Sequence, residues 1–152
     1  MFRGLHAINL DAKGRLAVPS RFREKLDLEA IKELVVTIDT ESPCLLLYPL
    51  PSWEDIEKKL ENLPSFNPAT RRIQRLLIGH ATELEIDNSG RILLPPLLRK
   101  HADLDKHIMF VGQGKKFELW DATQWETFCE KWLAEEANPE EQPPAELQSL
   151  SL

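Results

Sequence analysis

A duplicated segment constrains the fold of this 152-residue chain more than any other feature of its sequence. Residues 10–23, LDAKGRLAVPSRFR, match residues 86–99, IDNSGRILLPPLLR, at a constant offset of 76. A second match, at an offset of 72, pairs Leu47 with Leu119 and Trp53 with Trp125. Each copy has only about 50 residues, a size at which an independent core is marginal. We therefore expect the two copies to pack on each other and share one core.

The best-matched part of each copy predicts a tight turn between two short strands. Five positions are identical in the two copies: Asp11/Asp87, Gly14/Gly90, Arg15/Arg91, Pro19/Pro95 and Arg23/Arg99. An Asp at the first position and a Gly at the fourth suit a type I turn, because the Asp side chain accepts hydrogen bonds from the turn amides and the Gly can take a positive φ. Asp11, Gly14, Asp87 and Gly90 are therefore interpreted as turn residues, a role that requires no ligand.

The other patterns predict an α+β protein that is mainly β. Strands are expected at 5–10, 15–18, 34–38 and 44–48 in the first copy, and at 81–87, 91–94, 107–111 and 116–120 in the second. Helices are expected at 20–26, 53–63, 68–78 and 123–134. Ser52-x-x-Asp55 is a capping signal for the second helix, Asn67-Pro68 opens the third, Gly79 follows it, and Gly112-Gln113-Gly114 is typical of a hairpin turn.

These elements divide the chain into five segments. We predict a first repeat, a helical linker, a second repeat, a C-terminal helix and an acidic mobile tail, at 5–52, 53–80, 81–124, 125–134 and 135–152.

The distribution of charge points to nucleic acid, although the chain as a whole is acidic. The formal net charge is −6, but residues 1–25 carry six basic and two acidic side chains, a local charge of +4. Arginine makes bidentate contacts with phosphates and guanine edges. The candidate DNA-binding residues are Arg3, Lys13, Arg15, Arg21 and Arg91. A second interpretation of Arg15 and Arg91 stays open, in which each only braces its hairpin by pairing with an Asp.

Arg71, Arg72 and Arg75 form another basic group on the predicted linker helix. Such a group is usually a solvated helix face. It can also be a subunit contact, because Arg71 and Arg75 are spaced to lie on one side of a helix.

Patterns for catalysis or metal binding are weak. The four histidines show neither HExxH spacing nor a grouping of two histidines with a carboxylate, and no glycine-rich phosphate loop is present. Cys44 and Cys129 lie in apolar contexts typical of buried, unreactive thiols. No stretch approaches the ~20 apolar residues of a membrane span. We expect a cytoplasmic protein that is not an enzyme, with no cofactor, metal site, membrane contact or small-molecule substrate.

The motifs together resemble those of the MraZ family of bacterial regulators. The similarity runs from Met1 to about residue 134 and is densest in Met1-Phe2-Arg3-Gly4, Asn9-Leu10-Asp11-x-Lys13-Gly14-Arg15, Pro43-Cys44-Leu45-Leu46-Leu47-Tyr48-Pro49, Arg71-Arg72-x-Gln74-Arg75 and Gly79-His80-Ala81. The resemblance implies two AbrB/SpoVT-type swapped-hairpin repeats that form one pseudo-twofold unit. The family's Asp-x-x-x-Arg motif falls on Asp11/Arg15 and Asp87/Arg91.

The same resemblance implies a function. It implies ring-like homo-oligomers that bind tandem repeats in double-stranded promoter DNA, repress their own operon and the division and cell-wall gene cluster, and associate with the nucleoid.

An alternative from another class is an antitoxin-like protein-interaction module, since AbrB-like hairpins occur in both kinds of protein. The duplication favours the regulator, because an antitoxin of this type usually carries a single copy. Whether the second hairpin contacts DNA stays open, because Ser89 replaces Lys13 there.

Overall fold

The computed structural model describes residues 1–152, which form two compact units. The first unit, Met1–Ala122, contains both copies of the repeat, and the second, Thr123–Leu152, contains the C-terminal helices. The fold is α+β with antiparallel sheets as its main component, as the sequence predicts. None of the helices is long and apolar enough to cross a lipid bilayer.

Six strands of the first unit form one antiparallel sheet, in the order β1-β7-β8-β4-β3-β5. The strands are β1 (Phe2–Asn9), β3 (Glu33–Ile38), β4 (Leu45–Pro49), β5 (Thr82–Glu85), β7 (His107–Gly114) and β8 (Lys116–Asp121). Exchanging the equivalent strands of the two copies, β1 with β5, β3 with β7 and β4 with β8, reverses this order onto itself. The sheet therefore has a pseudo-twofold axis between its central strands, where Leu46 pairs with Glu118.

The outer strands of this sheet are exchanged between the copies. β1 pairs along its whole length with β7, with Ile8 opposite Ile108. β5 pairs with β3 in the equivalent way, with Leu84 opposite Leu34. The first strand of each copy thus completes the sheet of the other copy, which confirms the swapped-hairpin arrangement.

A small second sheet repeats the same symmetry. β2 (Arg15–Ala17) pairs antiparallel with β6 (Arg91–Leu93), with Leu16 opposite Ile92. The Val18 N–H donates to the Gly90 carbonyl at 2.9 Å, and the Leu94 N–H donates to the Gly14 carbonyl at 2.8 Å. These two bonds are equivalent at the offset of 76, so the pseudo-twofold axis of this sheet passes between its central residues.

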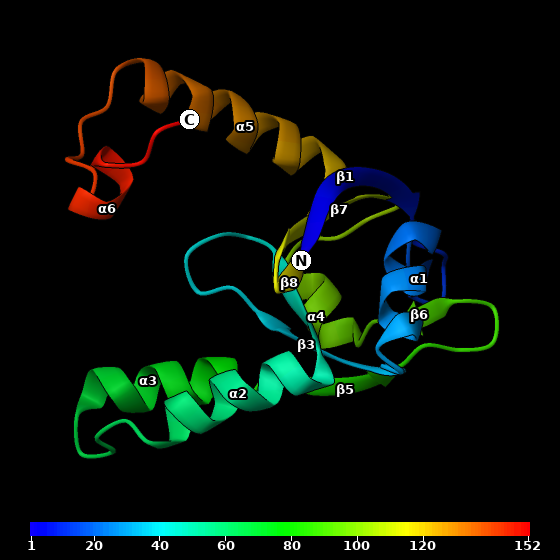
Figure 1. Ribbon diagram of the computed structural model, residues 1–152. Helices are drawn as coiled ribbons and strands as arrows, with labels where there is room; N and C mark the ends of the chain where they lie inside the picture. Colours follow the sequence, from blue (N-terminus) through cyan, green and yellow to red (C-terminus); the bar gives the residue numbers. More distant parts are fainter. The chain divides into compact units, whose positions relative to one another are not determined.

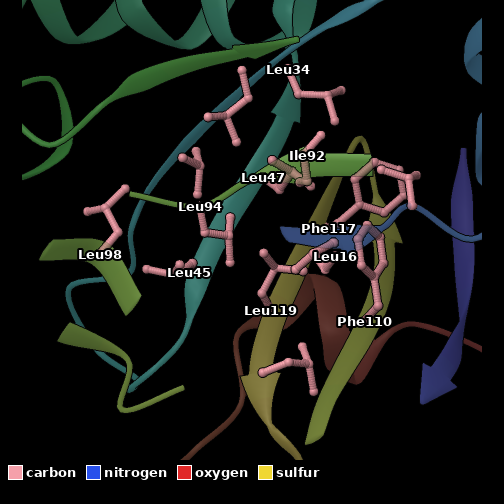
Figure 2. Packing of buried hydrophobic residues seen from close by; sticks show 14 of the residues in the cluster. Leu16, Leu34, Leu45, Leu47, Ile92, Leu94, Leu98, Phe110, Phe117 and Leu119 are labelled. Carbon is pink, nitrogen blue, oxygen red and sulfur yellow. The ribbon is translucent and has the colours of Figure 1, made fainter. Parts of the chain in front are cut away.

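One apolar core joins the two sheets. The side chains of Leu16 and Ile92 are each 1% exposed. They enter the same cluster as Leu47 and Leu119, which come from the central strands of the large sheet (Figure 2). Phe22 of α1 (Ser20–Leu28) and Leu98 of α4 (Pro96–His101) complete the cluster. The shared core predicted from the size of each copy is confirmed, and it fixes the small sheet in place.

Two helices connect the copies, α2 (Leu50–Glu61) and α3 (Pro68–Leu77), and they run side by side (Figure 1). The Gln74 side-chain amide on α3 donates to the Leu60 carbonyl at 2.7 Å. Asn67 caps α3 as predicted, because its Oδ1 accepts from the Ala69 N–H at 2.8 Å. The capping role predicted for Ser52 is wrong: β4 runs directly into α2, which begins at Leu50 with Pro51 in its first turn.

The predicted turn at Gly112-Gln113-Gly114 is also misplaced. Gly112 and Gln113 lie within β7, opposite Gly4 and Arg3. A Cβ at Gly112 would lie 2.6 Å from the Arg3 nitrogen, so this glycine permits the close approach of β1. The chain turns at Gly114 instead, which has a φ of 75°.

The second unit contains all but the first residue of α5 (Ala122–Ala137) and the short α6 (Ala145–Gln148). The ring centroids of Trp125 and Trp132 lie 5.8 Å apart in an edge-on contact, so both lie on one face of α5. α5 runs beyond the predicted end at residue 134. The side chains of residues 135–152 are exposed, and the mobility of this tail stays a prediction.

Candidate nucleic-acid interface

The turn before β2 is organised by the carboxylate of Asp11. Its Oδ1 accepts from the Lys13 N–H at 2.9 Å and from the Arg15 N–H at 2.8 Å, and the Gly14 N–H donates to the Asp11 carbonyl at 3.0 Å. Gly14 has a φ of 90°, which a residue with a Cβ rarely adopts. The bond from the Arg15 amide is the main cause of a lowered pKa for Asp11, and the Lys13 amide and the Arg15 charge act in the same direction. Asp11 therefore holds the turn in its ionised form.

The turn before β6 has the same construction. Asp87 Oδ1 accepts from the Ser89 N–H at 2.8 Å and from the Arg91 N–H at 2.9 Å, and Gly90 has a φ of 77°. The bond from the Arg91 amide lowers the pKa of Asp87, again with help from Ser89 and from the Arg91 charge. The hydrogen bonds of both turns agree with the structural role predicted for the two Asp/Gly pairs.

Each turn also sets the direction of the arginine that follows it. Arg15 Nε donates to Asp11 Oδ2 at 3.3 Å, and Arg91 Nε lies 3.4 Å from Asp87 Oδ2. All four side chains are between a third and a half exposed, so solvent screens these pairs and they add little stability. The interpretation in which each arginine braces its hairpin by pairing with an Asp is thus supported in part. Each guanidinium keeps donors that can reach a ligand.

The small sheet brings the two arginines onto one face. Arg15 lies opposite Leu93, and Arg91 lies opposite Ala17. Because alternate residues of a strand share a face, these four side chains point outward while Leu16 and Ile92 point into the core. Arg15 and Arg91 are diagonal neighbours across the strand pair, a relation that typically separates Cα atoms by about 7–8 Å. The pseudo-twofold axis thus produces a paired cationic feature on an outward face.

The other predicted basic residues lie at different distances from this face. Lys13 is exposed in the first turn, two residues before Arg15, and Arg21 is exposed in the first turn of α1. Arg3 is exposed on β1, seven residues from Leu10, and a strand of that length spans roughly 23 Å. The structure therefore places Lys13 and Arg15 together with Arg91, and it sets Arg3 apart from them. A DNA contact by Arg3 stays a prediction.

The two halves of the face differ in chemistry. The first copy contributes Ala17 to the face and carries Arg21 in the first turn of α1, whereas the equivalent positions in the second copy are Leu93 on the face and Leu97 in α4. Leu93 is 55% exposed and Leu97 is 68% exposed. The first copy therefore provides the more basic half of the face.

Two residues at this site were missed by the sequence prediction. The Arg99 guanidinium lies on Gly14, where an added Cβ would be 2.6 Å from Arg99 Cζ, and the Arg23 guanidinium lies on Gly90 with the same spacing. Each arginine therefore contacts the turn of the other copy, and β6 lies beside α1 (Figure 1). Their identity in both copies was the signal that pointed to them.

Cys44 is the centre of a separate polar cluster. Its thiol lies 3.6 Å from Asp39 Oδ2, and Glu118 is also within ligand distance of the two. Burial is the main cause of a strongly raised pKa for the Cys44 thiol, and the two nearby carboxylates add to it. A thiol held in its protonated form is a poor nucleophile, which agrees with the unreactive role predicted for it.

Comparison with known proteins agrees with this geometry. The chain matches the model of the MraZ protein family twice, over residues 1–76 and 77–147, and the description of that family also likens it to antitoxins. It is 64% identical to the transcriptional regulator MraZ of Coxiella burnetii (strain RSA 493 / Nine Mile phase I), over 100% of both chains. It is 55% identical to the protein of the same name from Legionella pneumophila (strain Paris) and 53% identical to that from Halorhodospira halophila, again over both full lengths.

Proposed function

Since the chain belongs to the MraZ family, we propose that it is a transcriptional regulator that binds specific DNA sequences through the outward face of the small sheet. The observation that carries this proposal is the pairing of Arg15 and Arg91 on that face by the pseudo-twofold axis. Ionised Asp11 and Asp87 orient the arginines through Nε and leave the other N–H donors of each guanidinium available. Arginines held in this way can make bidentate contacts with guanine edges or phosphates.

The same reasoning assigns unequal roles to the two hairpins. The first hairpin carries Lys13 and Arg15, and Arg21 follows it in α1, so we assign most of the phosphate contacts to the first copy. The second hairpin offers Arg91 beside Ser89 and the exposed Leu93. Apolar side chains contact thymine methyl groups in the major groove. The second hairpin therefore contributes fewer charge contacts, and any specificity it adds depends on shape and methyl groups.

The family membership supports the finer parts of the proposal. The protein acts in the cytoplasm, associates with the nucleoid and carries out no catalysis. It assembles into ring-like homo-oligomers on tandem promoter repeats, and it represses its own operon and the division and cell-wall gene cluster. Arg71, Arg72 and Arg75 are exposed on α3 and are available for contacts between subunits.

The test is a gel-shift titration of Arg15→Ala against DNA from upstream of the protein's own gene. Loss of a base or phosphate contact typically costs ~1–3 kcal/mol. The loss recurs in every subunit, so binding should become undetectable while the melting temperature and oligomer size stay unchanged. Lys59→Ala is the matched control, because Lys59 is exposed on α2, outside the small sheet. Wild-type affinity in Arg15→Ala would contradict the proposed interface.

A second candidate function is an antitoxin-like interaction with a protein partner. The family description and the exposed acidic segment 135–152 favour it. Parallel pulldowns with the promoter DNA and with a cell extract separate the two functions. A regulator retains the DNA in a manner that depends on Arg15, whereas an antitoxin retains a small toxic protein whether or not Arg15 is present.

A further inference from the structure

We propose that Arg23 and Arg99 are positioning residues that hold the two Asp-x-x-x-Arg turns crosswise. The arginine of each copy fixes the recognition turn of the other copy. The effect on DNA binding rests on the function proposed above, but the structural part of the inference does not.

The contact between Arg99 and the first turn is close and specific. Gly14 has a positive φ and is buried, and the Arg99 guanidinium occupies the space that a Cβ would need there. Arg99 Nε is itself buried and has no hydrogen-bond partner. The Cζ, Nε and Nη1 atoms of its planar guanidinium all lie within 3.0 Å of that Cβ position. The contribution of Arg99 is therefore packing on the turn that carries Lys13 and Arg15.

Arg23 contacts the second turn directly and is also linked to it by hydrogen bonds through Val18. The Arg23 guanidinium covers Gly90, and Arg23 Nε donates to the Val18 carbonyl at 2.9 Å. The Val18 N–H in turn donates to the Gly90 carbonyl at 2.9 Å. Helix α1 of the first copy is thereby connected to the turn of the second copy through two successive bonds. Neither guanidinium forms an ion pair, so the role of both arginines is to shape the turns.

This crossed arrangement has a functional consequence for the arginines on the outward face. Arg15 is directed by the turn that it closes, because its own amide bonds to Asp11. Loosening of Gly14 lets that turn open and leaves Arg15 without a fixed direction. A residue of the second copy, Arg99, therefore controls the geometry of the more basic half of the interface.

Hydrogen–deuterium exchange of the full chain, without DNA, tests the crossed contacts. We expect Arg99→Met to raise the exchange of residues 11–17 by about fivefold, the effect of losing one contact of ordinary strength, and to leave residues 87–93 unchanged. Arg23→Met should do the reverse. Lys100→Met is the matched control, because it removes one charge from the same helix at an exposed position and should change neither segment.

The proposal is overturned if each variant speeds exchange in the turn of its own copy, if both turns respond equally, or if neither responds. Arg99→Lys keeps most of the stem and the charge but not the planar group. It should show a smaller effect on the same segment 11–17, and it serves as the test if the methionine variant does not fold.

A gel-shift titration of the same variants completes the experiment. Arg99→Met should weaken promoter binding even though Arg15 is present, whereas Lys100→Met should bind at least as tightly as Arg99→Lys. If each methionine variant speeds exchange in the turn of the other copy but the wild type does not bind the promoter DNA, the proposed function alone is disproved. If Arg99→Met and Arg23→Met exchange like the wild type while Arg15→Ala abolishes DNA binding, the crossed positioning alone is disproved.

Discussion

The carboxylates of Asp11 and Asp87 stabilise their turns only while they are ionised. Both have a pKa below the ordinary value of 3.8, mainly because backbone amides of the turn donate to them. A lowered pKa in the folded state means that folding favours the charged form. This contribution to stability is therefore fully present above pH 3.8 and is lost as the pH falls through the folded pKa values.

The double variant Asp11→Asn/Asp87→Asn tests this pH dependence. An asparagine oxygen can still accept from the same amides, but it does not titrate in this range. The melting temperature of the wild type should fall more steeply than that of the variant as the pH is lowered from 5 to about 2. Melting curves that run parallel over this range would show that the two turns do not contribute to acid sensitivity.

At the level of elements, the small sheet packs its inner side on the core and exposes its outer side to solvent. Ile92 is 1% exposed and its neighbour Leu93 is 55% exposed, although both belong to β6. Ile92→Ala leaves a cavity in the shared core and should lower the free energy of unfolding by about 2–5 kcal/mol. Leu93→Ala should leave the melting temperature within a degree or two of the wild type, since its side chain contributes little to the core.

Chemical denaturation of the two variants measures this difference directly. The pair also separates stability from recognition, because Leu93→Ala should change promoter affinity without changing stability. Equal destabilisation by the two substitutions would mean that β6 does not present its residues to the core and to solvent as the structure has them.

The same elements show what a sequence can predict. Asp11, Gly14 and Asn67 act within a few residues of themselves, so their turn and capping roles were predicted correctly. Ser52 and Gly112 were misjudged, because the direct entry of β4 into α2 and the close approach of β1 depend on packing between distant segments.

The positions of the site residues show the same limit. Placement of Arg15 and Arg91 on one face requires the pairing of β2 with β6, which no local pattern in the sequence contains. The crossing of Arg23 and Arg99 depends on the same long-range pairing. Their repetition in the sequence marked them as important without indicating which turn each one touches.

For the whole molecule, a net charge of −6 limits how tightly one face can hold DNA. A patch that makes a few phosphate contacts binds non-specifically with Kd values of roughly 10⁻⁴–10⁻⁶ M. Identical faces displayed by an oligomer can raise the overall affinity by about 10²–10⁴ through avidity. The proposed regulation therefore requires several faces to engage adjacent repeats at once.

Changing the spacing of the promoter repeats tests this requirement. Faces that bind one side of the duplex need repeats separated by about 10–10.5 bp or a multiple of it. Insertion of ~5 bp between intact repeats should reduce affinity toward that of a single repeat, whereas insertion of a full turn should reduce it much less. A gel-shift series over both spacings measures the effect, and equal affinities would show that each face binds independently.

The strand exchange between the copies also decides how the protein responds to dilution. Because β1 and β5 are exchanged within one polypeptide, the outward face of the small sheet forms in a reaction of first order that needs no second chain. Association of separate chains does depend on concentration. As the protein becomes scarce, the proposed assemblies would dissociate while every chain keeps a complete face. The number of molecules in the cell would then set how many faces act together. In an autorepressor of this kind, assembly would respond to the protein's own concentration while the fold of each chain stayed intact.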